Sequence, residues 1–417
     1  MKPKVKSDFD IIIVGAGMVG LTIASLLKDD QLRIAVVDKS DTPPVPMVSE
    51  LESSNFDARV SALSAASREI LKRAGAWRII ESKRYCDFSS MFVWDADGTG
   101  SVKFSAEELS VPRLGTIIEN SFVVDALLEN LYKKANLEIF RPCSIISLDE
   151  GDESVLLKTE DNLRLRAKLV IAADGVNSKI RELANFRVRE WEYNHDAIVA
   201  TVKTESPHQE MALQRFMQTG PLAFLPLCTG LEIDCQDCSS IVWSAEPSYA
   251  KKLFSLSDDE FCFELTQASE SRLGRIIDCS RRHLFPLRQR HAVNYSKRRI
   301  ALAGDAAHSI HPLAGQGANL GLLDAEALVN KITEGLNAGR EVADPVIMDR
   351  YQRARKAHNL GMMGLMQGFK HLFADETMIV RWLRNVGMSS INDMGICLLY
   401  TSPSPRDVEE SRMPSSA

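Results

Sequence analysis

Apolar and polar positions near the start of the chain predict a strand, a turn and a helix. Residues 11–27, IIIVGAGMVGLTIASLL, carry no charge and have the pattern of a buried strand that breaks at three glycines and resumes as a helix. A second apolar run, 32–37, predicts the next strand and ends at Asp38. Strand, glycine turn, helix and strand together predict the first βαβ unit of a doubly wound fold.

The three glycines of this unit have the G-x-G-x-x-G spacing of a dinucleotide site. Gly15 permits a tight turn, Gly17 lets the backbone approach a pyrophosphate, and Gly20 allows the helix to pack closely on the strand. The helix N-terminus then faces the phosphates. Asp38, at the end of the second strand, is placed to accept a hydrogen bond from a ribose hydroxyl.

The same apolar run has an alternative interpretation as a membrane span or a signal peptide, because three lysines precede it. Asp8 and Asp10 interrupt that basic flank, and no small-residue cleavage site follows. The dinucleotide interpretation is therefore favoured.

Further along, apolar positions with a period of 3.6 predict helices, and short alternating or continuous apolar runs predict strands. The predicted helices are 64–76, 121–134, 318–333 and 345–388. The predicted strands are 88–104 with a turn at Asp97-Gly98, then 139–148, 154–158, 163–168, 169–173, 197–202, 214–217, 222–227, 240–243 and 297–303. Residues 191–282 consist mainly of strands joined by polar loops and predict a β-rich second domain.

Two of these strands end in chemically suggestive turns. The strand 169–173 runs into Asp174-Gly175, and the strand 297–303 runs into Gly304-Asp305. Ligands of open α/β sheets bind at the carboxyl edge, so Asp305 is placed to accept from a sugar hydroxyl. Asp-Gly on its own also fits an ordinary turn. The glycine-rich segment 315–317 opens the helix 318–333, and its backbone N–H groups would face an anionic ring or phosphate.

Composition narrows the class of protein. A chain of 417 residues with 45% hydrophobic residues favours two domains with a sizeable core. The net charge of −6 gives no basic field for nucleic acid. Eight irregularly placed cysteines without an export signal favour reduced thiols in the cytoplasm.

Several side chains have both a functional and a structural interpretation. Arg59 either binds a cofactor phosphate or is a solvated residue at a helix start. Cys235 and Cys238 have the spacing of half a zinc site, but no second pair completes it, so no metal is expected. His308 and His311 could bind metal or act as an acid–base pair, and a positioning role is favoured.

An apolar segment in the second domain, 220–227, either lines a hydrophobic pocket or packs in the core, and core packing is the simpler explanation. Four residues are candidates for a substrate pocket in this domain: Phe216, Phe224, Pro226 and Trp243.

The C-terminal part contains an apolar helical stripe of Met362, Met366, Phe369 and Phe373. Packing against the cofactor domain is favoured over contact with a membrane or an isoprenoid tail, which nearby cations would assist. Residues 397–417 lose all periodicity, and we expect them to be a non-native tail that replaces the natural C-terminus.

Three motifs together resemble those of the class A flavoprotein aromatic hydroxylases, which share the p-hydroxybenzoate hydroxylase fold. In chain order they are GAGMVG with Asp38, AADGVNSKIR and GDAAHSIHPLAGQGANLG. Within that group, five segments resemble the ubiquinone-biosynthesis hydroxylases: HPLAGQGANLG, 57–63, Ile118-Glu-Asn120, Trp191-Glu-Tyr193 and 220–227. Phe92-Val-Trp94-Asp95 and the segment 197–208 resemble the 2-polyprenylphenol hydroxylase branch. The resemblance spans about residues 8–395.

This resemblance implies an FAD site and assigns residues to it. On the adenosine-diphosphate side lie Gly15, Gly17, Gly20, Asp38, Arg59 and Asn120. Asp174 and Gly175 match the motif associated with both FAD and NAD(P)H. Gly304 and Asp305 belong to the FAD site, where Asp305 matches the acid on the ribityl chain. The flavin-ring and substrate side comprises His311, Pro312, Gly315, Gln316, Gly317 and Asn319. No acid or base is assigned, and Ala318 is smaller than the residue that relatives often carry there.

The resemblance also implies domains and chemistry. The FAD-binding domain is expected to comprise 1–75, 113–190 and 282–344, the β-rich substrate domain 76–112 and 191–281, and the C-terminal helices 345–396. The implied reaction transfers oxygen from O2 to the ring of a polyprenylated phenol, with FAD and NAD(P)H as cofactors. A ubiquinone-biosynthesis complex and peripheral membrane contact of a cytoplasmic protein are also implied. Two alternatives are a flavin hydroxylase of a soluble aromatic acid and a non-catalytic flavin-binding scaffold.

Overall fold

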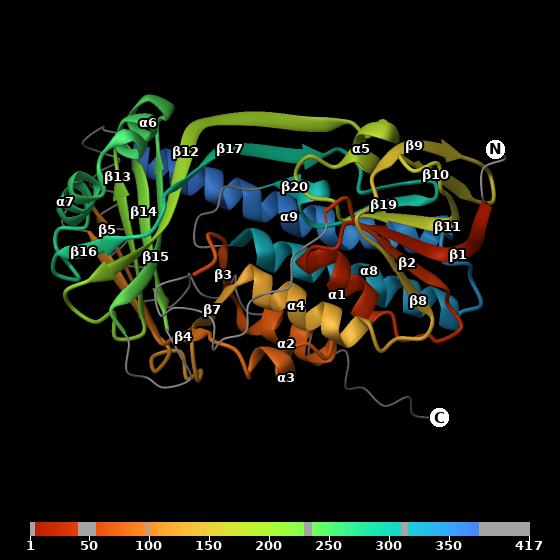
Figure 1. Cartoon of the computed structure of the whole chain (residues 1–417), viewed down its shortest axis with the longest axis horizontal. Helices are drawn as coiled ribbons and strands as arrows, with labels where there is room; N and C mark the ends of the chain where they lie inside the picture. Colours follow the sequence, from red (N-terminus) through yellow and green to blue (C-terminus); the bar gives the residue numbers. More distant parts are fainter. Residues whose placement is uncertain (1–4, 41–55, 97–99, 229–235, 310–315, 375–417) are drawn as a thin grey trace.

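The computed structural model of the chain describes residues 5–40, 56–96, 100–228, 236–309 and 316–374. An eight-stranded sheet lies at one end and a nine-stranded sheet at the other, and a three-stranded sheet lies between them (Figure 1). Helices pack against both of the large sheets. The predicted mixed α/β class with a β-rich second part is confirmed.

The eight-stranded sheet is built around β1 (Val5–Val14). Four further strands run parallel to it in the order β19-β11-β1-β2-β8: β19 (Ile300–Leu302), β11 (Arg164–Ala172), β2 (Ile34–Val37) and β8 (Leu137–Phe140). Three further strands, each paired antiparallel with its neighbour, complete the sheet: β9 (Ile145–Glu150), β10 (Val155–Thr159) and β18 (Ser296–Lys297). Parallel strands are covered on both faces, which explains why 11–14 is a continuous apolar run.

The predicted runs 163–168 and 169–173 form the single strand β11. Its first half alternates between buried and less buried residues, whereas its second half, between β1 and β19, is buried on both faces. The change of pattern within one strand therefore reflects a change of environment.

Helix α1 (Met18–Leu26) packs between α4 (Asn120–Leu131) and α8 (Gln316–Asn337), and α9 (Pro345–Ala374) packs along α8. Shorter helices are α2 (Ala65–Arg73), α3 (Trp77–Ile80), α5 (Lys179–Leu183) and the 3-10 turn η2 (Gly304–Ala306). The helices predicted at 64–76, 121–134 and 318–333 are confirmed. No helix in the described part of the chain has the length and apolar character needed to cross a bilayer.

The nine-stranded sheet includes two long strands that reach toward the eight-stranded sheet, β12 (Val188–Thr204) and β17 (His283–Ala292) (Figure 1). Its other strands are β5 (Ser90–Asp95), β6 (Ser101–Ser105), β13 (Met211–Met217), β14 (Gly220–Leu227), β15 (Cys238–Ala245), β16 (Ile276–Cys279) and β20 (His308–Ser309).

The second domain also contains α6 (Pro247–Ser255) and α7 (Asp258–Ala268), which the strand-based interpretation missed. Both helices have start signals. Pro247 occupies the first turn of α6, and Ser257 and Glu260 form a reciprocal capping box at α7.

The three-stranded sheet has the order β3-β7-β4, from β3 (Val60–Leu63), β7 (Gly115–Glu119) and β4 (Cys86–Phe88). The segment predicted as one strand region, 88–104, is thus divided: β4 joins this sheet, and β5 and β6 join the nine-stranded sheet. A buried cluster from β3, β4, β7, β14 and β15 fills the space between the two sheets. The domain boundaries given above stay predictions.

Two glycines of the first turn provide a matched test of packing. A Cβ built on Gly20 lies 2.0 Å from the carbonyl oxygen of Gly15, whereas a Cβ on Gly17 meets no described atom within 4 Å. We expect Gly20→Ala to lower the free energy of unfolding by about 1–3 kcal/mol, because backbone must move. Gly17→Ala should change it little. Urea unfolding followed by circular dichroism checks this, and equal effects of the two variants would contradict it.

Candidate functional site

The carboxyl ends of four parallel strands meet at one edge of the eight-stranded sheet. Backbone hydrogen bonds continue the ladder past the strand ends, from Gly15 N to Val37 O (2.7 Å) and from Ala303 N to Ala172 O (2.9 Å). The segments that leave this edge begin at Gly15 after β1, Asp38 after β2, Asp174 after β11 and Gly304 after β19. The structure therefore brings together the motifs predicted from the sequence.

The glycine turn presents an uncapped helix end at this edge. Gly15 has φ +112°, a conformation that favours glycine. Gly17 is the N-cap residue of helix α1, which has no side-chain cap and no acid in its first turn. Asp38 Oδ2 accepts a hydrogen bond from Ala16 N at 2.6 Å and holds the turn against the end of β2. The free N–H groups of the first turn form a cradle suited to an anion.

The segments after β11 and β19 are tied together by an arginine that the sequence analysis did not single out. Arg181 is buried and donates to Val176 O at 2.7 Å and to Ala306 O at 2.9 Å. Asp174 Oδ2 accepts from Lys179 N at 2.7 Å and so caps α5. Burial raises the pKa of the Asp174 carboxyl, against the hydrogen bonds that it accepts.

The pairing of β3 with β7 brings Arg59 next to Asn120. Asn120 N donates to Arg59 O at 3.0 Å, and Ser61 Oγ donates to Asn120 Oδ1 at 2.6 Å. The neighbouring Glu119 accepts two hydrogen bonds from Arg84, at 2.7 and 2.9 Å, and both side chains are buried. This buried ion pair ties the end of β7 to Arg84. The sequence alone did not indicate that Arg84 and Glu119 would meet.

The segments after β11 and β19 and the paired strands β3 and β7 with their flanking residues border a cavity of about 660 Å³ next to the nine-stranded sheet. Polar groups from the first domain that line it include Arg59, Asn120 and Asp305. The opposite wall is mainly apolar and comes from β12, β15 and β17: Ala197, Val199, Ser240, Val242, Phe285, Pro286 and Leu287, with Arg288 and Arg290 at its side. The volume is in the range of small-molecule sites.

Asp305 is the acid of this cavity. Its side chain is accessible from the cavity but closely surrounded by protein, and this desolvation raises the pKa of its carboxyl. The positive charges of His308 and Arg59 oppose that shift. The Arg59 guanidinium lies over the Phe285 ring, 5.4 Å from its centroid. Asp305 can therefore accept from a hydroxyl of a bound molecule.

A buried ionic network supports the turn that carries Asp305. Asp324 of α8 is fully buried and accepts from His308 Nε2 at 2.5 Å, from Arg355 Nε at 2.7 Å and from Gly304 N at 3.1 Å. Although burial opposes ionisation, the charges and hydrogen bonds of His308 and Arg355 hold the pKa of Asp324 below its ordinary value. His308 thus contacts the carboxylate that also holds Gly304, and its positioning role stays a prediction.

The sequence analysis missed Asp324, although a signal was present. Leu320, Asp324 and Leu328 follow one another at four-residue spacing on the buried face of α8. An acid within an apolar helical stripe indicates a buried partner. Its partner Arg355 lies 31 residues further along the chain and could not be identified from spacing.

Other predicted residues have different surroundings. Asn319 is buried, and its side-chain amide makes three hydrogen bonds. Its Oδ1 accepts from Ser64 N (2.9 Å) and Ser67 Oγ (2.6 Å), and its Nδ2 donates to Ala62 O (2.8 Å). The side chain therefore holds β3 and α2 in place. Gly317 and Ala318 lie in the first turn of α8, and Ala318 lines the cavity. Gln316 begins the helix, and its side-chain environment is not described. His311, Pro312, Gly315 and Cys235 lie outside the described residues.

Two of the four pocket candidates lie in the core. Phe224 and Trp243 are about 1% exposed and pack with Ile198 and Ile241 on the face of the nine-stranded sheet that points away from the cavity. Their neighbours Ser240 and Val242 line the cavity instead, because successive side chains of a strand point to opposite faces. Pro226 is buried and Phe216 half-buried, and neither belongs to the cavity lining.

Comparison with known proteins identifies the class. Residues 8–364 match the family described as FAD binding domain. The 3-demethoxyubiquinol 3-hydroxylase of Escherichia coli K12 is 34% identical over 93% of this chain and 95% of its own length. The ubiquinone biosynthesis monooxygenase COQ6 of Xenopus tropicalis is 30% identical over 92% and 90%. The solved structure of Pseudomonas aeruginosa PqsL superposes with a TM-score of 0.75 at 21% identity, over 92% of this chain and all of that one.

Fold and site thus define an FAD-dependent monooxygenase. With relatives of this identity along nearly the whole chain, the protein belongs to the ubiquinone-biosynthesis hydroxylase family within the FAD-binding-domain enzymes.

The described residues fit FAD. The uncapped N-terminus of α1 and the open space at Gly17 suit a pyrophosphate, because backbone N–H groups point there and no side chain fills the cradle. Asp305 follows β19, two strands across the sheet from β1, and together with the 660 Å³ cavity it suits the polyol and ring portion. The donor set is oxygen and nitrogen from backbone and side chains, as a dinucleotide requires.

The buried histidine His291 predicts a pH dependence of stability. Burial and nearby positive charges lower the pKa of His291 from 6.5 to about 4, and its Nε2 lies 3.1 Å from the Tyr295 hydroxyl. Between these values the unfolded chain binds a proton that the folded protein does not, so stability falls as pH drops from 6.5 toward 4.

We expect the fall in the free energy of unfolding between pH 6.5 and pH 4 to be about 3 kcal/mol smaller in His291→Gln than in wild type, because glutamine does not titrate. Urea midpoints of wild type and variant, measured between pH 7 and about pH 4, check the difference. His208 and His358 titrate in both proteins, so only the difference between the two profiles reports His291. Parallel profiles would show that His291 is not the responsible group.

Proposed function

We propose that this protein hydroxylates the aromatic ring of a polyprenylated phenol in ubiquinone biosynthesis, with NAD(P)H as electron donor and O2 as co-substrate. One observation carries the proposal: the cavity joins the polar sheet edge, with Arg59, Asn120 and Asp305, to an apolar wall of the second domain. A polar edge suits the cofactor, and an apolar wall suits a hydrophobic ring. Two relatives named above, a 3-demethoxyubiquinol 3-hydroxylase and a ubiquinone biosynthesis monooxygenase, support this choice.

The chain's own residues would have distinct tasks in this reaction. Gly15, Gly17 and Gly20 would hold the pyrophosphate, Asp38 the adenosine ribose, and Arg59 with Asn120 the phosphates. Asp305 would accept from the ribityl chain, and Asp174 with Gly175 would border both FAD and NAD(P)H. FAD, when bound, supplies the redox chemistry that activates dioxygen.

The remaining part of the site would orient the ring and exclude water. The apolar side chains from β12, β15 and β17 would surround the substrate ring. The N-terminus of α8 at Gly317 would face the flavin ring, where its N–H groups stabilise negative charge. His311, Pro312, Gly315 and Gln316 would complete the substrate side of the site. No residue is assigned as acid or base.

A substrate with an isoprenoid tail implies further partners. Such a tail is insoluble in water, so we propose peripheral contact with a membrane and membership of a ubiquinone-biosynthesis complex. The protein would then act at the cytoplasmic surface of the membrane.

A second candidate function, hydroxylation of a soluble aromatic acid, is favoured by one residue. Arg288 lines the cavity, is exposed, and has no ion-pair partner among the residues that the structure describes. A guanidinium in that position could bind a carboxylate in bidentate geometry.

The proposed role of Asp305 can be tested through flavin retention. We expect Asp305→Asn to lower FAD affinity about tenfold, because a charge-assisted hydrogen bond of roughly 1.4 kcal/mol is weakened. The measurement is the ratio of flavin to protein absorbance after dialysis, with Kd from fluorescence titration. The exposed acid Asp349 supplies the control Asp349→Asn, which should bind as wild type. Unchanged retention in Asp305→Asn would refute the role.

Substrate class can be tested with the purified FAD-loaded protein. Polyprenylated phenols should stimulate NAD(P)H and oxygen consumption, and cells lacking the gene should accumulate a non-hydroxylated polyprenylphenol that the gene clears. Stimulation by small phenolic acids instead, lost in Arg288→Met, would support the second function. A non-catalytic scaffold would bind FAD but show no substrate-dependent oxygen consumption. Active-site variants would then still rescue the phenotype of cells in which the gene is deleted.

A further inference from the structure

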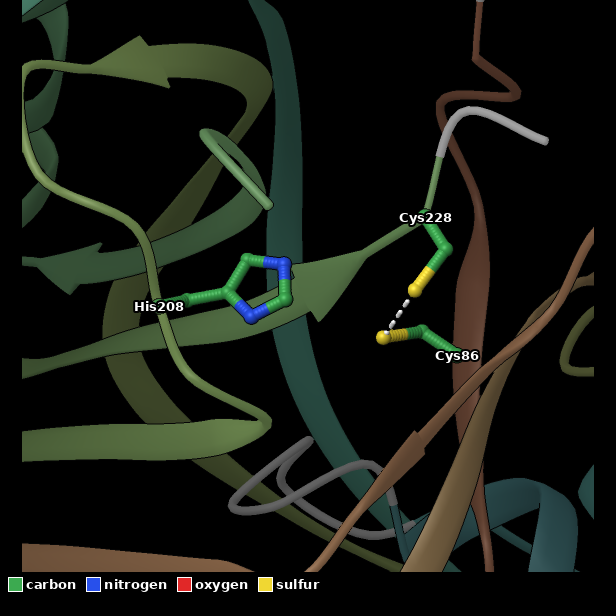
Figure 2. Close-up of side chains that lie close together, drawn as sticks. All are labelled: Cys86, His208 and Cys228. Carbon is green, nitrogen blue, oxygen red and sulfur yellow. Dashed lines mark hydrogen bonds between the residues drawn. The ribbon is translucent and has the colours of Figure 1, made fainter. Parts of the chain in front are cut away.

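Two cysteine thiols from distant parts of the chain meet between the sheets. Figure 2 shows Cys86 and Cys228 with their side chains pointing toward each other, and their Sγ atoms lie 2.6 Å apart. The two residues are separated by 142 positions in the sequence. Neither cysteine is assigned a role in the proposed function.

The pair lies where the three-stranded sheet packs on the nine-stranded sheet. Cys86 begins β4, which pairs with β7, and Cys228 directly follows β14. Cys86 belongs to the buried cluster between these sheets, against which Cys228 packs. The pair therefore sits where a covalent bond would join both sheets.

His208 lies beside the pair, and its ring nitrogens already have partners. A ring nitrogen and both sulfurs fall within 4.8 Å of one another, as a metal site requires. However, His208 Nδ1 accepts from Glu210 N at 3.1 Å, and Nε2 lies 3.1 Å from Leu227 O. This pattern fixes a neutral ring with its proton on Nε2, which leaves no lone pair for a metal.

The sulfur contact also disfavours a metal. Two thiolates on tetrahedral zinc, each with a bond of about 2.3 Å, stand roughly 3.8 Å apart. The sulfurs here are closer than two zinc ligands would be. The distance between the two Sγ atoms lies between that of a disulfide bond, about 2.05 Å, and that of an ordinary non-bonded contact.

The two thiols differ in reactivity. Cys86 is about 1% exposed, whereas Cys228 is half-buried. The hydrogen bond between them lowers the pKa of Cys228, while the same bond and burial raise the pKa of Cys86. Cys228 is thus the thiol that loses its proton first, and the thiolate is the nucleophile.

We propose that Cys86 and Cys228 form a redox-active thiol pair, which a peroxide converts into a disulfide between β4 and the end of β14. The Cys228 thiolate attacks one oxygen of hydrogen peroxide, the O–O bond breaks, and hydroxide leaves as water after taking a proton. Cys86 sulfur then attacks the resulting sulfenic acid, an S–S bond forms, and a second water leaves with the proton of Cys86. Both thiols are oxidised by two electrons in total, and the peroxide is reduced to two waters.

Such a disulfide would form on oxidation and would stabilise the site. It would join the three-stranded sheet, whose β3 lines the cavity, to the sheet that forms the opposite wall. A cross-link closing so long a loop restricts the unfolded chain strongly. The oxidised protein should therefore unfold at a higher temperature than the reduced one.

Peptide mapping of the full-length, FAD-loaded protein tests the proposal without any variant. The protein is treated with hydrogen peroxide, denatured, alkylated, digested and analysed by mass spectrometry. We expect a linked pair of peptides containing Cys86 and Cys228 that disappears on reduction with dithiothreitol, and a rise in Tm of several degrees that dithiothreitol reverses. The result does not depend on hydroxylase activity, so failure of the proposed function would leave it unaffected.

Three cysteine variants show whether the effect belongs to Cys86 and Cys228. The linked peptides and the Tm rise should be absent from Cys86→Ser and Cys228→Ser, and both should persist in Cys143→Ser, which removes another buried thiol. Full alkylation of Cys86 and Cys228 in peroxide-treated wild type would overturn the proposal. Stoichiometric zinc in the purified protein, lost in Cys86→Ser, would overturn it in favour of a metal site.

Discussion

The parallel pairing of β1 with β2 and β11, extended by β19, is the constraint on which the rest of the structure depends. Parallel strands end at the same edge, so this one arrangement brings together segments that lie far apart in the sequence. It also leaves the N-terminus of α1 without a side-chain cap at that edge. The site therefore follows from strand direction before any individual side chain is considered.

The edge itself needs support from buried charges, because its turns are short and polar. Arg181 joins the segments after β11 and β19 through two carbonyl oxygens. Asp324 joins η2 to α8 and, through Arg355, to α9. Removing one partner from such a buried pair leaves an uncompensated charge, which costs several kcal/mol. The position of Asp305 thus depends on Asp324 and Arg355, two side chains that do not line the cavity.

The nine-stranded sheet serves two purposes through the alternation of its side chains. One face of β15 places Ile241 and Trp243 in the core of the second domain, and the other places Ser240 and Val242 in the cavity wall. Large aromatic residues, which are attractive pocket candidates in a sequence, are here needed for the core. Smaller residues on the opposite face leave room for a ligand. The pairing of β3 with β7 places Arg59 and Asn120 on the other side of the cavity from that face.

The sequence by itself determined the βαβ unit, the strand ends at Asp38, Asp174 and Gly304, and the class of enzyme, because these depend on local periodicity, turn chemistry and short motifs. The tertiary structure alone decided which face of β15 meets the cavity and which partners Asp324, Glu119 and Cys228 find. Strand register sets which of two opposite faces a side chain joins, and contacts across many residues of chain leave no periodic trace in the sequence. The C-x2-C spacing of Cys235 and Cys238 suggested half a zinc site, whereas the fold placed Cys228 against Cys86, a pairing that spacing could not indicate.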